Sequence, residues 1–145
     1  MNARALSVVG FLLAAIAAPA ISVAMFLMLS KMTGIRLQGP PLGPDLPLAF
    51  AFATVLGLVP SLFFGGLTLL TLRVLFAIWP PGVLILAVGG LAAAALYCLV
   101  FGLTGMGPWG VGSPWKAPDS SLIVVSILLS GALAGLIYAA FARRG

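Results

Sequence analysis

The stretch from Leu46 to Arg73 reads LPLAFAFATVLGLVPSLFFGGLTLLTLR, and Arg73 is its only charged residue. A helix needs about 20 consecutive apolar residues to cross the hydrocarbon core of a bilayer, and this stretch exceeds that length. Small residues recur in it at every fourth position, in one row along a helix: Ala49, Ala53, Gly57, Ser61 and Gly65. Such rows let two membrane helices approach closely. The stretch therefore predicts a membrane span that organises the fold, with the other apolar tracts as its partners.

The composition of the whole chain agrees with this interpretation. Of its 145 residues, 63% are hydrophobic and 6% are charged, which lies outside the range of water-soluble globular domains. We therefore expect an all-α, polytopic integral membrane protein, a single transmembrane domain over residues 1–145 whose four helices form an up-and-down bundle. The expected spans cover residues 7–30, 47–73, 83–103 and 122–142, with outer loops at 31–46 and 105–121.

Every apolar tract repeats the small-residue spacing of the second one. Close crossings of neighbouring helices are therefore expected, at angles of roughly −40° for the closest pairs. The expected helix-packing positions are Gly10, Ala14 and Ala18 in the first span, Ala53, Gly57, Ser61 and Gly65 in the second, Gly90 and Ala94 in the third, and Gly131 and Gly135 in the fourth.

Two prolines lie near the midpoints of predicted spans. Pro19 is in the first span and Pro60 is in the second, and each ring removes a backbone donor and so frees a carbonyl one turn earlier. We predict a helix kink at both. The first tract also resembles a secretory signal with a cleavage site around Ala18 to Ala20, but its apolar residues continue to about residue 30, which favours a retained span.

The charged residues stand singly at the ends of apolar tracts, although the net charge is +5. This pattern reports membrane orientation and does not favour nucleic acid as a partner. One side of the predicted bundle has four arginines and no acid, namely Arg4, Arg73, Arg143 and Arg144. The other side has Lys31, Arg36 and Lys116 together with both acids. By the positive-inside rule, both termini are expected in the cytoplasm of a bacterial cell, with the spans in its inner membrane.

Aromatic and basic side chains near the span ends suit the headgroup layer of the membrane, because they offer one apolar part and one polar part. We expect four interface anchors: Arg73, Trp79, Trp109 and Trp115.

Few side chains in the chain suit catalysis or metal binding. There is no histidine and one cysteine, Cys98, and the only carboxylates are Asp45 and Asp119, which precede predicted spans where a helix cap is expected. We therefore predict no catalytic residue, no metal site and no cofactor, and a protein that is not an enzyme.

Three functions remain open on the sequence alone. The first is a non-enzymatic protein acting through helix packing, as an accessory or assembly subunit of a membrane complex or as a homo-oligomer, because four small-residue rows exceed what a lone bundle needs. Its partners are the lipid bilayer and other membrane subunits or further copies of itself.

The second is a small channel or carrier for a neutral or lipid-like solute. Ser22, Ser61 and the carbonyls freed by Pro19 and Pro60 then form a polar spot at mid-membrane. The third is an intramembrane enzyme that modifies lipids, with only Asp45, Asp119 and Arg73 available to it.

Overall fold

Four α-helices make up the structure, a computed structural model that describes residues 8–34, 46–75, 82–104 and 118–142. They are α1 (Val8–Thr33), α2 (Leu46–Val74), α3 (Val83–Thr104) and α4 (Pro118–Ala142). Each contains a segment long and apolar enough to cross a membrane, which suggests a multi-pass membrane protein. The prediction of an all-α chain with four helices of spanning length is confirmed.

Two helices extend beyond the predicted spans by more than one residue. The outer loop was expected to start at Lys31, but α1 continues to Thr33, whose hydroxyl donates to the Leu29 carbonyl at 2.8 Å. The helix ends at Gly34, which has a φ of 67°, the left-handed conformation that glycine adopts at little cost. At the other extension, α4 begins at Pro118, so Asp119 lies inside the helix and not before it. Proline suits a first helical position because its missing N–H has no helical acceptor there.

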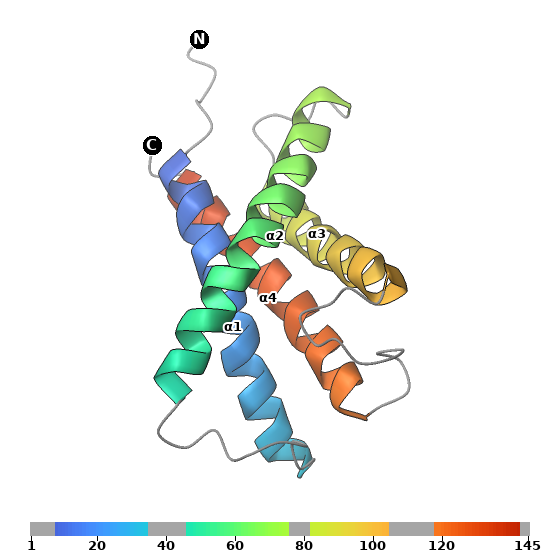
Figure 1. The fold of residues 1–145 in the computed structure, drawn as a ribbon. Coiled ribbons are helices and arrows are strands. Elements are labelled where there is room, and N and C mark those ends of the chain that lie inside the picture. The colour runs from blue at the N-terminus through green and yellow to red at the C-terminus, as the bar shows by residue number, and fades with distance from the viewer. Residues whose placement is uncertain (1–7, 35–45, 76–81, 105–117, 143–145) are drawn as a thin grey trace.

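Of the four helices, α4 makes the most extensive contacts with its neighbours, whereas the sequence interpretation had treated α2 as the organising helix. It packs extensively against α1 on one side and α3 on the other, and the start of α1 lies beside the end of α4 (Figure 1). In contrast, α2 packs against α1 and only weakly against α3, and its backbone does not approach that of α4 within the described residues. Hydropathy alone did not distinguish the two helices because both are apolar throughout.

The contact between α3 and α4 is close enough to bring backbone against backbone. A Cβ added to Gly90 would overlap the Gly131 carbonyl, and one added to Gly135 would overlap the Leu86 carbonyl. A Cβ at Gly131 would also lie 2.6 Å from that of Ala94, inside contact distance. The two helices therefore cross at residues with little or no side chain, because larger ones would hold the backbones apart.

A second close contact joins α1 to α2. Gly57 faces the ring of Pro19, and a Cβ at Gly57 would lie 2.5 Å from the Cβ of Pro19. Further along, a Cβ at Gly65 would lie 3.3 Å from the Phe11 ring. Since α1 and α2 run in opposite directions (Figure 1), these two contacts fix the register of the pair.

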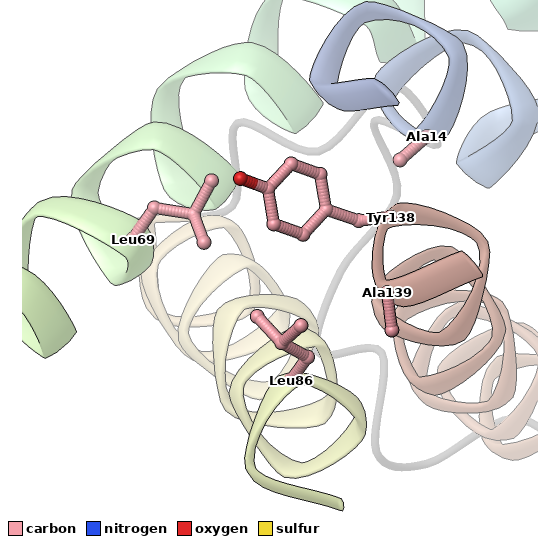
Figure 2. Packing of buried hydrophobic residues seen from close by; sticks show 5 residues of the cluster. All are labelled: Ala14, Leu69, Leu86, Tyr138 and Ala139. Carbon is pink, nitrogen blue, oxygen red and sulfur yellow. The ribbon is translucent and has the colours of Figure 1, made fainter. Parts of the chain in front are cut away.

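A small hydrophobic cluster joins all four helices at the end of the molecule where α1 begins and α4 ends. Its buried members are Ala14, Leu69, Leu86, Tyr138 and Ala139. Figure 2 shows the Tyr138 ring crossing from α4 toward Leu69, with its hydroxyl directed at α2. The tyrosine therefore fills the space between the separated backbones of α2 and α4 at this end.

The outer face of α2 carries large apolar side chains. Val55, Val59 and Phe63 are 65 to 70% exposed, and Leu67 and Leu70 continue the same surface. In water such a surface would cost free energy, whereas hydrocarbon chains are as apolar as these side chains.

Candidate functional site: a central cavity

A cavity of about 610 Å³ lies between α2 and the other three helices, and all four helices contribute to its lining. It exists because the backbones of α2 and α4 are held apart while α1 and α3 connect them on either side. The Tyr138 cluster lines one end, through Ala14, Leu69, Leu86 and Tyr138. This volume lies within the range of about 300 to 1,000 Å³ that is typical of small-molecule sites.

The cavity wall is mostly apolar, with few hydrogen-bonding groups and no charged side chain. The polar side chains that line it are Ser22, Ser61, Thr68, Tyr97, Ser130 and Tyr138. Two of these bond within their own helices: the Thr68 hydroxyl donates to the Phe64 carbonyl at 2.9 Å, and the Ser130 hydroxyl donates to the Ile127 carbonyl at 2.8 Å. Charged molecules would lose their hydration here without compensation, so the lining suits a neutral one.

Ser22 and Ser61 differ from the other lining hydroxyls. Neither side chain forms a hydrogen bond within the described residues. Every fully buried side-chain polar atom there does have a partner, so the two serine hydroxyls are not fully buried. Both serines are half-buried, so their hydroxyls lie open to the cavity. They are therefore available to a bound molecule.

The two prolines leave backbone carbonyls without their usual donor in residues of the same wall. Because Pro19 and Pro60 lack an N–H, the carbonyls of Ala15 and Leu56 lose the donor that an α-helix normally supplies. All four residues line the cavity. The residues that carry the polar spot expected from the sequence, namely Ser22, Ser61, Ala15 and Leu56, thus all line one cavity.

A pair of aromatic rings borders the cavity between α2 and α3. The rings of Phe64 and Tyr97 meet edge to face, with centroids 5.9 Å apart and planes at 74°. Phe63, the neighbour of Phe64, packs edge to face with it at 5.2 Å but is itself exposed on the outer surface. Edge-to-face pairs are favourable because the positive ring edge meets the negative ring face.

A shallower groove lies on the outer surface between α2 and α3. Gly89, Thr68 and Leu72 line both the groove and the central cavity, and a Cβ added to Gly89 would lie 3.2 Å from Thr68 and 3.5 Å from Leu72. The groove is lined by Leu67, Thr71, Leu84, Val88 and Leu96 among others.

The structure places the expected helix-packing residues in two groups. Gly90, Ala94, Gly131 and Gly135 meet at the crossing of α3 and α4. The second group lines the cavity and consists of Ala14, Ala18, Gly57, Ser61 and Gly65. Gly90 and Gly131 line the cavity too, so these two glycines belong both to the helix crossing and to the cavity wall. Gly10 is buried in α1, and Ala53 lies in α2 with its side chain outside the described set.

The predicted kinks and anchors are only partly visible. Pro19 and Pro60 both lie inside continuous helices, and the bend at each stays a prediction. Arg73 is exposed in the last turn of α2 and is absent from the cavity wall. Three of the four expected anchors, Trp79, Trp109 and Trp115, lie outside the described residues. So do Asp45, residues 35–45 of the predicted loop at 31–46, and residues 105–117 of the predicted loop at 105–121. Among the described residues no three His, Cys, Asp or Glu side chains form a group.

Sequence reasoning missed the bulky side chains that close and border the cavity. Leu69, Leu86 and Phe64 are unremarkable in an apolar span, because Leu, Phe and Val also occupy many positions on its other faces. Tyr97 and Tyr138 offered a usable signal, since a tyrosine within a span must place its hydroxyl, and both line the cavity. Comparison of the chain with known protein families, with curated proteins and with solved structures finds no match.

Proposed function

We propose that this chain is a non-enzymatic, multi-pass protein of the bacterial inner membrane that binds a neutral, lipid-like molecule in its central cavity. Both termini face the cytoplasm in this proposal. The observation that carries it is the cavity of about 610 Å³, which all four helices line without a charged side chain. Of the three functions open on the sequence, a small carrier for a neutral or lipid-like solute fits this geometry best.

The composition of the wall supports a ligand that is mostly hydrocarbon. Leu, Phe, Val and Ala side chains provide apolar contact, while hydroxyls at Ser22 and Ser61 provide a few points of orientation. Sites for small molecules combine these two features, in which the apolar surface supplies area and the polar groups supply specificity. The volume of about 610 Å³ suits one drug-sized molecule.

An accessory subunit or homo-oligomer remains the alternative proposal. It was motivated by more small-residue rows than one bundle needs. The close contacts of Gly57, Gly90, Gly131 and Gly135 are all made inside this chain, so these four glycines need no partner to explain them. The apolar outer face of α2 still offers a surface to a neighbouring helix.

Purification of the full chain from its native membrane, followed by mass spectrometry of proteins and lipids, tests the proposal. We expect one neutral lipid to be enriched over its share of the membrane, with Ala18→Phe lowering the enrichment because Ala18 lines the cavity. Ala24→Phe is the matched control, since Ala24 lies on the same helix and is exposed. A stoichiometric partner protein with no enriched neutral lipid would favour the accessory subunit instead.

A further inference from the structure

We propose that the molecule bound in the cavity carries a hydroxyl group, which the Ser61 side chain and the Ala15 backbone carbonyl bind together. The ligand class is then a neutral lipid alcohol. This inference rests on the proposed function and deepens it.

The register of α1 and α2 brings Ser61 and Ala15 to the same level. Pro19 contacts Gly57, and Phe11 contacts Gly65, about two turns away along each antiparallel helix. Ala15 is midway between Phe11 and Pro19, and Ser61 is midway between Gly57 and Gly65. Both residues line the cavity, so a ligand at this level meets both.

The two groups have complementary hydrogen-bonding needs. The Ala15 carbonyl is an acceptor that has lost its helical donor because Pro19 has no N–H. The Ser61 hydroxyl forms no hydrogen bond within the described residues and can donate. An alcohol group both donates and accepts, so it can donate to the Ala15 carbonyl while it accepts from Ser61.

The surroundings make this pairing selective. Polar groups in a mostly apolar wall cost free energy when they are left unpaired, and an alkane in the cavity would satisfy neither group. An ether oxygen accepts but cannot donate, so it would satisfy Ser61 alone. The order of affinity should therefore be alcohol, then ether, then alkane, with each step about three- to tenfold.

Competition for tritiated 1-hexadecanol in detergent micelles measures this order on the full chain. The unlabelled competitors are 1-hexadecanol, hexadecyl methyl ether and hexadecane, each given as a mole fraction in the micelle. Saturable binding of all three in the expected order supports the inference. Saturable binding with equal affinity overturns it and leaves the proposed function standing, whereas no saturable binding of any probe contradicts the proposed function itself.

Two variants test which protein group causes each difference in affinity between the three ligands. Ser61→Ala should abolish the advantage of the ether over the alkane, and Pro19→Ala, which restores a donor to the Ala15 carbonyl, should abolish the advantage of the alcohol over the ether. Thr71→Ala is the control, because Thr71 is on α2 but outside the cavity, where its hydroxyl donates to the Leu67 carbonyl at 2.8 Å. An unchanged order in both cavity variants would show that other groups select the ligand.

Discussion

Gly90 of α3 and Gly131 of α4 lie so close together that a Cβ on either residue would overlap the carbonyl group of the other. Backbone atoms cannot rotate away as the tip of a side chain can, so the helices themselves must shift to admit a methyl group. This contact therefore sets how near α3 stands to α4, and hence the width of the cavity that both helices line.

Gly90→Ala should lower the free energy of unfolding by about 1 to 3 kcal/mol, the usual cost of overpacking. Gly66→Ala is the matched control, because a Cβ there would lie 3.7 Å from the Phe11 ring, an ordinary contact. Since alanine is the better helix former, the control should be neutral or slightly stabilising. Denaturant titration of both variants in the same detergent makes the comparison. Equal stabilities would show that α3 and α4 can move apart to admit a methyl group without loss of stability.

Gly57→Ala should destabilise the contact between α1 and α2, because its Cβ meets the rigid Pro19 ring at 2.5 Å. Gly57→Leu should lower stability further. A double-mutant cycle with Pro19→Gly isolates the contact, since that change removes the ring and its Cβ. We expect the double variant to lose less stability than the sum of the two single variants. Strict additivity would mean that the two residues do not press on each other.

Pro60→Ala should lower the melting temperature in detergent, even though alanine favours a helix more than proline does. We predict that the Pro60 ring bends α2 and that the neighbouring helices are fitted to this bend, so a straightened helix would misalign Gly57 and Gly65 against α1. Pro47→Ala is the control, because Pro47 is exposed near the start of α2. A melting temperature raised or unchanged by Pro60→Ala would contradict this expectation.

Tyr138→Ala should cost about 3 kcal/mol or more, because Tyr138 is only 4% exposed and its ring fills the space between α2 and α4. Tyr138→Phe should cost less, since it keeps the ring and loses only the hydroxyl. Phe141→Ala, which removes a 40% exposed ring on the same helix, provides the control. If unfolding titrations show a larger loss of stability for Phe141→Ala than for Tyr138→Ala, Tyr138 is not part of the core.

The four helices could be predicted from the sequence because length, apolar content and charge placement fix where a chain can enter and leave a bilayer. Only the helix ends differ from the prediction. Lys31, for example, is still helical, because α1 ends at Gly34 and not at its first charged residue. Helix termini are set by local caps, which hydropathy does not register.

The partners of each helix could not be predicted in the same way. The row of Gly57, Ser61 and Gly65 indicates a face that something approaches, but it does not say whether a helix or a cavity lies there. In the structure Gly57 meets Pro19 while Ser61, one turn later, opens to the cavity. Such a difference depends on the crossing angle between α1 and α2, which sets how fast the two helices move apart on either side of their contact. The sequences of the two helices do not reveal this angle.

The central claim is that the cavity admits one neutral, lipid-like molecule, and saturable binding of tritiated 1-hexadecanol to the purified full chain tests it most directly. The account predicts about one molecule bound per chain, loss of this binding in Ala18→Phe, which fills the cavity, and its retention in Ala24→Phe, which adds the same ring on the exposed face. Uptake that rises in proportion to micelle concentration, equal in both variants and in the parent, would contradict it.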